Sequence, residues 1–561
     1  MSVSNSSKMI FPNGSHSVKP EMAKLPGTAL EGSPAGSIPT WCGALTAVAF
    51  DEPGWRAHLR SLDQPCYVVS DGARLGVTHQ PSAASGGEKL ALLAAVSPMR
   101  PSQLGNPHFR TAHGLKYSYA AGAMANGIAS ADLVIALGQA QLLASFGAAG
   151  LTARHIEAAL QRIQSALPNG PYMFNLIHSP SEEALERNAV ELYLKYGVKT
   201  VEASAYMALT THIVRYRASG LRLTQQGEID VQHKVIAKVS RREVAAQFLE
   251  PAPAGLLQQL VAQGLINEQQ AQMAQRIPMC DALTVEADSG GHTDNRPLVC
   301  LLPALLDLRD ELQAKHGYEQ AVHIGAAGGI GTPAAALAAF MLGADYVLTG
   351  SVNQACVESG ASAHTRRILA QAGQADVMMA PAADMFEMGV KVQVLKKGTL
   401  FPMRAQKLYE LYKSCDSLEA IPASEREKLE TQVFRKPLAV IWQETEAFFR
   451  ERDPDQLERA AQNPKRKMAL VFRWYLGLSS RWSNSGEVGR EMDYQIWCGP
   501  AMGAFNEWTH GTSLALPENR HAVDVAEHLM TGAAYLYRQQ HLRAQGVTLP
   551  SGLASYKIID F

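Results

Sequence analysis

Short β-forming runs alternate with amphipathic helical patterns from about Lys116 to Thr349, and this rhythm is the strongest constraint on the fold. A parallel strand needs a crossover, usually helical, before the next strand can pair with it. Eight such units in a stretch of this length are typical of an α/β fold of the (β/α)8 TIM-barrel type. An open, doubly wound parallel sheet satisfies the same alternation and stays as the alternative. The expected strands are residues 117–123, 145–149, 172–177, 199–204, 234–239, 283–288, 321–326 and 345–349.

The domain boundaries follow from where this rhythm starts and stops. Residues 1–38 are rich in Ser, Pro and Gly and read as a disordered polar tail, and 39–115 as an N-terminal accessory segment. The barrel is expected over 116–390, interrupted by a helical insertion at about 251–280. Residues 391–561 are mostly helical by pattern, and we expect them to form a helical domain that covers the barrel mouth.

Composition excludes several classes of function. A formal net charge of −1 gives no bulk electrostatic case for nucleic acid. The longest apolar run is too short for a bilayer span, and the N-terminus lacks the layout of a signal peptide. Seven cysteines are scattered without a C-x-x-C pair, which argues for free thiols and against a zinc site. We therefore expect a cytoplasmic protein with no membrane, nucleic-acid or metal partner.

A polar loop follows the sixth expected strand, with the sequence Glu286-Ala-Asp-Ser-Gly-Gly-His-Thr-Asp294. Gly290 and Gly291 let the backbone approach a flat ligand closely. His292 then lies where an imidazole can exchange a proton near neutral pH. An ordinary turn with a solvated histidine fits the same residues.

Two further glycine-rich loops follow the last two expected strands, Gly325-Ala-Ala-Gly-Gly-Ile-Gly331 and Thr349-Gly-Ser-Val-Asn353. Exposed backbone N–H groups and helix N-termini favour an anion. In TIM barrels the loops after strands seven and eight commonly form the phosphate site. Since neither loop has the G-x-G-x-x-G spacing, a Rossmann interpretation fits poorly.

With these motifs laid out, the chain resembles the 2-nitropropane dioxygenase/nitronate monooxygenase-like flavoproteins, which include FMN-dependent enoyl-[acyl-carrier-protein] reductases. The matching pieces are Gly122-Ala-Met-Ala-Asn-Gly127, Asn175, Gly290-Gly-His292, Ala327-Gly-Gly-Ile330, and Gly350-Ser351 with Glu358-Ser359. The tail segment 494–506 resembles more specifically the PfaD-type, trans-acting enoyl reductases of polyunsaturated fatty acid synthases and trans-acyltransferase polyketide synthases. Where many relatives have Gly-Thr-Arg-Phe, this chain has Gly350-Ser-Val-Asn353, so a phosphate would rely on backbone amides and Ser351.

The resemblance implies FMN at the barrel mouth, NADPH as reductant, and a 2-enoyl thioester on an acyl carrier protein as substrate. The catalytic residues it implies are His292 and Lys238. The FMN-binding residues it implies are Gly122, Ala123, Met124, Asn175, Lys238, Asp288, Gly290, Gly291, Ala327, Gly328, Gly329, Gly350 and Ser351.

Each of these assignments has a plainer alternative. A role in hydrogen bonding alone also fits His292, and core filling also fits Met124. Lys238 lies in an apolar strand and needs a partner, which is either the flavin edge or a carboxylate, Glu202 or Glu286. Asn175 and Asp288 also fit a strand-end cap and a turn cap, although Asp288 is equally suited to orient His292 or bind ribityl hydroxyls.

Two segments outside the barrel keep open roles. The glycine-rich stretch 497–506 either approaches the barrel mouth or packs in a core, and the basic, aromatic stretch 465–482 is either a solvated helix face or a docking site for an acidic carrier protein. Two functions compete with the enoyl reductase: a nitronate monooxygenase-like small-substrate flavin oxidase, and a non-catalytic structural subunit. A homodimer is compatible with each of them.

Overall fold

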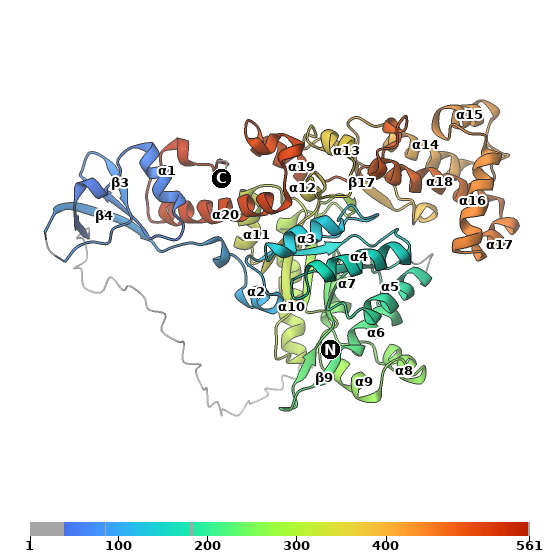
Figure 1. Ribbon diagram of the computed structural model, residues 1–561, viewed down its shortest axis with the longest axis horizontal. Helices are drawn as coiled ribbons and strands as arrows, with labels where there is room; N and C mark the ends of the chain where they lie inside the picture. The colour runs from blue at the N-terminus through green and yellow to red at the C-terminus, as the bar shows by residue number, and fades with distance from the viewer. Residues whose placement is uncertain (1–38, 85, 180–182, 559–561) are drawn as a thin grey trace, which may run out of the picture.

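A closed barrel of eight parallel strands forms the centre of the protein (Figure 1). The computed structural model describes residues 39–84, 86–179 and 183–558, so the expected polar tail at 1–38 lies outside the described residues. The barrel strands are β5 (Tyr119–Ala121), β6 (Leu143–Phe146), β7 (Met173–Ile177), β8 (Thr200–Ser204), β11 (Lys234–Val239), β12 (Ala282–Glu286), β14 (His323–Ala327) and β15 (Tyr346–Thr349). The (β/α)8 prediction is confirmed. The open-sheet alternative is wrong, because β5 pairs with β15 as well as with β6 and closes the ring.

Helices surround the ring, as the amphipathic patterns predicted. They are α3 (Ala131–Gln139), α4 (Ala153–Ala166), α5 (Glu183–Lys195), α6 (Thr211–Ser219), α7 (Arg242–Leu249), α10 (Leu298–His316), α11 (Pro333–Met341), α12 (Ser351–Gln354) and α13 (Ala363–Leu369). Between α7 and β12 the chain adds α8 (Ala254–Ala262) and α9 (Glu268–Ala274). The ring interior is filled by side chains: Tyr346 is fully buried, and Phe109 of α2 (Pro107–His113) stacks on it with ring centroids 4.1 Å apart.

A three-stranded antiparallel sheet stands at the barrel mouth, in the order β13 (Gly291–His292), β17 (Lys391–Leu395), β16 (Val377–Pro381). The segment from 391 onward, expected to be mostly helical, begins with the strand β17. Val392 and Val394 alternate with polar neighbours at the two-residue period of a strand, and both are buried. The sheet pairs His292 with Val392, so it holds the histidine loop in place.

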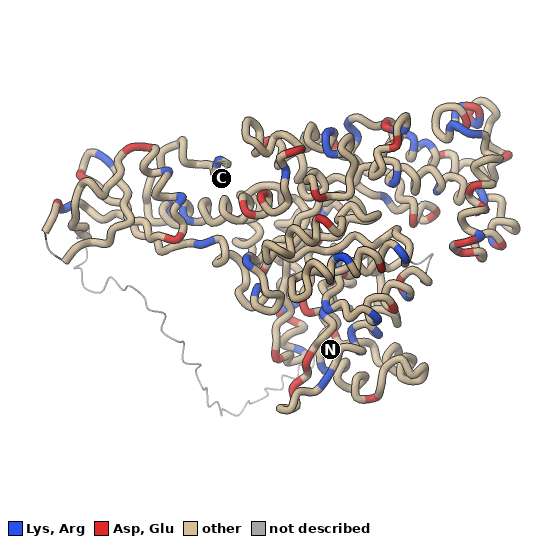
Figure 2. Tube along the Cα trace, viewed as in Figure 1, with Lys and Arg blue, Asp and Glu red and all other residues tan. Residues whose placement is uncertain are grey.

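A helical segment follows β17 and packs beside the mouth (Figure 1). Its helices are α14 (Phe401–Ser414), α15 (Ala423–Lys428), α16 (Leu438–Arg452), α17 (Asp455–Gln462) and α18 (Pro464–Ser485). Asn463 caps α18 by accepting from the N–H groups of Lys465 and Arg466, and Gly486 ends it with φ +70°. Acidic and basic residues are interspersed along the chain (Figure 2), in keeping with the near-zero net charge.

The end of the chain turns away from the mouth. After α19 (Ala501–Thr509), α20 (Ala522–Ala544) crosses α11 and reaches the N-terminal four-stranded sheet, which has the order β1 (Thr40–Gly43), β4 (Glu88–Val96), β2 (Cys66–Ser70), β3 (Leu75–Thr78). Buried Arg538 of α20 donates to the carbonyls of Ser61 and Leu62 at 3.0 and 3.1 Å, just after α1 (Glu52–Arg60). The N-terminal sheet, α1 and α20 therefore form one unit beside the barrel (Figure 1).

Within the described residues, no helix combines the length and the apolar character that crossing a bilayer requires.

Candidate active site

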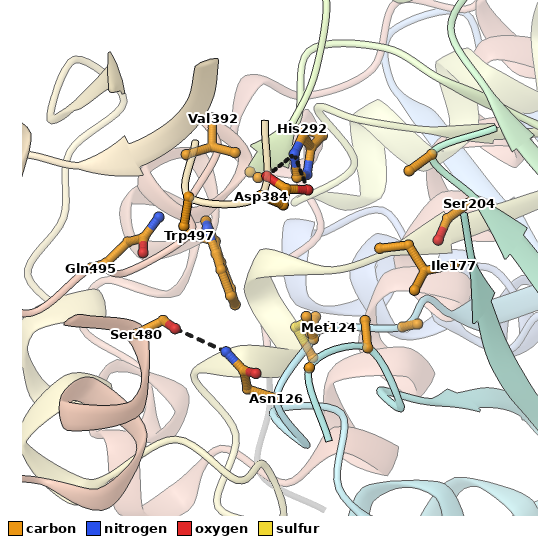
Figure 3. Close-up of a pocket in the computed structure, with 18 of the residues that line it drawn as sticks. Met124, Asn126, Ile177, Ser204, His292, Asp384, Val392, Ser480, Gln495 and Trp497 are labelled. Carbon is orange, nitrogen blue, oxygen red and sulfur yellow. Dashed lines mark hydrogen bonds and ion pairs between the residues drawn. The ribbon is translucent and has the colours of Figure 1, made fainter. Parts of the chain in front are cut away.

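A cavity of about 580 Å³ opens at the carboxyl ends of the barrel strands. This volume lies in the range of roughly 300–1,000 Å³ that small-molecule and cofactor sites occupy. Its walls come from the barrel loops, from the sheet of β13 and β17, and from α16 and α18 (Figure 3). The carboxyl rim is where TIM-barrel enzymes place their active sites.

Most of the residues that the sequence assigned to the site line this one cavity. They are Gly122, Ala123, Met124, Asn175, Lys238, Gly290, Gly291, His292, Ala327, Gly328, Gly329, Gly350 and Ser351. Because they come from six different strand ends, only closure of the barrel brings them together.

Asp288 is the exception, and both of its expected ligand-site roles need correction. Its side chain does not line the cavity but accepts from Asn295 Nδ2 at 2.8 Å and Gln393 Nε2 at 2.7 Å. These bonds tie the loop after β12 to β17, so Asp288 holds the turn, the alternative that the sequence left open.

His292 is paired with Asp384 instead. The Nε2 atom of His292 lies 3.2 Å from both carboxylate oxygens of Asp384 (Figure 3). Burial acts to lower the pKa of His292, but Asp384 and, more weakly, Glu286 outweigh it and raise the pKa above its ordinary value. The same pairing overcomes the effect of burial on Asp384 and lowers the pKa of its carboxyl. The pairing therefore favours an imidazolium beside a carboxylate.

The sequence interpretation missed Asp384, although a signal for it exists. The apolar run 377–381 ends shortly before this acid, as the run 282–285 ends before the histidine loop. Spacing gave no reason to join two residues that are 92 positions apart, and only the sheet in which β17 pairs with both β13 and β16 does so.

Lys238 forms an ion pair with Glu286, one of the two carboxylates that the sequence offered. Its Nζ lies 3.2 Å from Glu286 Oε1, on the neighbouring strand. Burial acts to lower the pKa of Lys238, while Glu286 and Glu202 outweigh it and raise the pKa. Lys238 thus brings a positive charge to the cavity floor.

Glu202 is fully buried on β8 and is only half satisfied. Its Oε2 accepts from the Ala123 N–H at 2.7 Å, whereas Oε1 has no partner among the described residues. An unpaired buried acceptor costs free energy.

Asn175 and Met124 lie where a flat ligand would meet them. Asn175 donates to the Glu202 carbonyl at 3.1 Å and to Ser204 Oγ at 2.9 Å, so its amide also serves the structural role of joining β7 to β8. Met124 packs against the core and faces the cavity (Figure 3). Two residues later Asn126, which the sequence interpretation passed over, donates to Ser480 Oγ of α18 at 2.8 Å.

The glycine loops form a cradle at the edge of the cavity. Gly328 and Gly329 have φ values of +85° and +74°, which favour glycine. A Cβ atom on Gly328 would lie 2.6 Å from the Ala287 backbone, whereas one on Gly329 or Gly350 would meet nothing within 4 Å. The backbone at 329 and 350 therefore borders open space.

The segment 497–499 closes this cradle. The Gly499 N–H donates to Ser351 Oγ at 3.1 Å, and Gly290 packs so closely on Cys498 that a Cβ would lie 2.8 Å from its backbone. Trp497 and Gly499 line the cavity, while Cys498 is fully buried. The segment thus both approaches the mouth and packs in a core, the two alternatives that its sequence allowed.

Comparisons with known proteins agree with this architecture. Three family profiles match: "Nitronate monooxygenase" over residues 108–414, "Fatty acid synthase subunit PfaD N-terminal domain" over 41–98, and "[Acyl-carrier-protein] S-malonyltransferase, inserted helical domain" over 415–494. The first of these covers more than half of the 561 residues.

Individual relatives extend the likeness. A polyunsaturated fatty acid synthase subunit of Thraustochytrium sp. is 47% identical over 87% of this chain, which spans 33% of that protein. Polyketide biosynthesis protein PksE of Bacillus subtilis is 44% identical over 80% of this chain, which spans 58% of that protein. The solved enoyl reductase domain of MlnA, from the macrolactin biosynthesis cluster of Bacillus amyloliquefaciens, superposes with a TM-score of 0.75 at 40% identity.

That alignment covers 78% of this chain and 99% of the solved domain, so the likeness includes the barrel and the segments beside its mouth. The chain belongs to the nitronate monooxygenase family, among the members that carry the PfaD N-terminal domain.

Proposed function

We propose that the protein is an FMN-dependent enoyl reductase, which uses NADPH to saturate the 2,3-double bond of enoyl thioesters held on an acyl carrier protein. The observation that carries the proposal is the cavity itself, in which a glycine cradle, a partly buried lysine and a histidine–carboxylate pair meet. The names of the relatives support the reaction and its setting, because they include an enoyl reductase domain and proteins of fatty acid and polyketide synthesis.

The residues present fit FMN. The open backbone at Gly329 and Gly350, with Ser351 beside it, would hold the phosphate. Lys238 would face the ring edge that gains negative charge on reduction. The chemistry that FMN supplies when bound is transfer of a hydride taken from NADPH.

His292 would act where the substrate gains charge. Addition of a hydride to the β-carbon places negative charge on the thioester oxygen, and the α-carbon then takes up a proton to give the saturated thioester. An imidazolium held by Asp384 can stabilise that charge and donate that proton. Lys238, partly buried and paired with Glu286, keeps a fixed positive charge nearby and does not need to move a proton.

The helical segment argues for a large substrate. Residues of α16 and α18, among them Phe448, Leu470 and Trp474, extend the cavity beyond the barrel mouth. This segment also matches the helical domain of an enzyme named for acting on acyl carrier protein. A nitronate monooxygenase-like oxidase, favoured by the barrel profile, and a structural subunit remain the competing functions.

An anaerobic flavin assay separates the three functions. The reductase requires a yellow protein that NADPH bleaches and that a crotonyl thioester recolours, with butyryl thioester as product. Recolouring only by oxygen or a nitronate would support the oxidase. A colourless protein that takes up no added FMN would support the structural role.

A further inference from the structure

One stripe of α18 faces the cavity with an unusual composition. Arg473, Gly477 and Arg481 line the cavity and are spaced by four residues, which puts them on one face of the helix. Eight helical residues span about 12 Å, so the two arginines lie more than two turns apart. Arg481 is exposed, whereas the Arg473 side chain is only 11% exposed, so the stripe runs from the protein surface toward the interior.

Gly477 is not explained by packing. Glycine in the interior of a helix is unfavourable relative to alanine. A Cβ atom on Gly477 would meet nothing within 4 Å, so no neighbouring residue requires glycine here. Any side chain at this position would extend into the cavity. The glycine therefore suits a ligand that passes close to the helix backbone between the two arginines.

Among the described residues, the acids near the stripe each lie beside a cation. Glu444 of α16 also lines the cavity, but its carboxylate is held by Lys436 at 2.6 Å. Arg473 has Glu387 at 3.7 Å, and Arg466 shares that carboxylate. The acids on the barrel side, Glu286 and Asp384, are paired with Lys238 and His292. Of the two arginines of the stripe, Arg481 lies nearer to solvent.

Apolar side chains flank the stripe. Trp474 and Leu478 of α18 lie beside the stripe in the cavity wall, and Phe448 and Phe449 of α16 are part of the same wall. This arrangement fits a slender chain with a charged group at one end better than a uniformly polar molecule.

We propose that the Arg473–Gly477–Arg481 stripe binds the phosphorylated arm that carries the thioester, with the phosphate at Arg481 and the arm crossing α18 at Gly477. The inference rests on the proposed function, since acyl carrier proteins hold their acyl group on 4′-phosphopantetheine. A phosphate of NADPH has the same chemistry. The surface position of Arg481 favours the arm, because the carrier protein stays outside while its arm reaches inward.

The test compares two substrates that differ only in the phosphate: crotonyl-4′-phosphopantetheine and crotonyl-pantetheine. Wild-type enzyme should have the higher kcat/KM for the phosphorylated thioester. Arg481→Gln should reduce that preference about tenfold, the effect expected for loss of a charge-assisted hydrogen bond. Arg459→Gln is the matched control, because Arg459 is an exposed arginine of α17 outside the cavity lining.

The possible results test the proposed function and the proposed role of the stripe separately. Turnover of neither thioester by wild-type enzyme would overturn the proposed function and the stripe with it. Equal turnover of both, unchanged in Arg481→Gln, would overturn the stripe alone. A loss in Arg481→Gln that appears with NADPH but not with NADH, equally for both thioesters, would assign the arginine to the nicotinamide cofactor and also overturn the proposal.

A second variant tests the passage across the helix. Gly477→Leu should raise the thermal midpoint, as leucine favours a helix over glycine, yet lower kcat/KM for both thioesters by up to about a hundredfold by displacing the arm. Gly255→Leu, at a helical glycine of α8 that is also open within 4 Å but remote from the cavity, should raise the midpoint without the kinetic loss. Full turnover by folded Gly477→Leu enzyme would refute the proposal that the arm crosses α18 at Gly477.

Discussion

The pairing of His292 with Asp384 leads to a prediction about the pH dependence of turnover. The carboxylate raises the pKa of His292, so the imidazolium persists to higher pH than an ordinary histidine. If the imidazolium supplies the proton, the rate should fall as pH rises through that raised pKa. Asp384→Asn removes the charge but keeps the shape, and should move the fall to lower pH. Glu286 still favours the charged form in the variant, and Lys238 still opposes it.

The size of the effect follows from the geometry of the pair. Opposite charges 3.2 Å apart attract by about 5 kcal/mol at an effective dielectric constant of 20. The two side chains are 37% and 39% exposed, so solvent screening reduces the net value to that of an exposed pair, roughly 0.2–1 kcal/mol. At pH values where the rate falls with rising pH, the protonated fraction of His292 and the rate should therefore be about 1.4- to 5-fold lower in Asp384→Asn than in the wild-type enzyme.

The assay is kcat for a crotonyl thioester between about pH 6 and pH 9, with bound FMN measured in parallel. Asp416→Asn is the control. It makes the same change in net charge at a side chain that is 97% exposed on the helical segment, and should leave the profile in place. If the pH profile of kcat for Asp384→Asn matches that of the wild-type enzyme, or shifts to higher pH, His292 is not the proton donor.

Three further predictions concern the site and its support. His292→Ala should retain bound FMN and lose about 10²- to 10⁴-fold in enoyl turnover, and wild-type turnover would rule out the chemical role. Gly329→Asp should yield colourless protein because its carboxylate competes with the phosphate. Gly329→Ala is the control: it has the same backbone strain at φ +74° but no charge, and should keep part of its flavin. Normal flavin absorbance of the aspartate variant would contradict the assignment of the phosphate to this loop. Asp493 is fully buried and accepts from Tyr475 Oη at 2.8 Å and Arg490 Nη1 at 3.1 Å. Asp493→Ala should therefore lower the free energy of unfolding, measured by urea titration, by about 3–5 kcal/mol. A loss below about 1 kcal/mol would show that these hydrogen bonds and ion pairs are dispensable for stability.

The sequence by itself determined the barrel and which glycine-rich loops form its carboxyl rim. Strand and helix periods are local properties of the chain, so eight β/α units could be read in order and were confirmed as a closed ring. The glycine loops at 290 and 328 could be read for the same reason, because a short run of glycines after a strand constrains its own backbone.

The tertiary structure alone decided which side chains meet. Lys238 had two carboxylates within the predicted strands, and the register of β11 with β12 selected Glu286. Asp288, two residues along from Glu286, turned toward β17, and Asp384 became the partner of His292. Such pairings depend on sheet register and on chain segments that are about 90 residues apart or more, for which no local period exists.

The same reason applies to the ends of the chain and to the cavity wall. No pattern in α20 indicates that it returns to the N-terminal sheet, and no pattern in α18 indicates that Gly477 borders open space. Burial and contact are properties of the packed whole, and a sequence period specifies only which face of an element will be apolar, not what that face will meet.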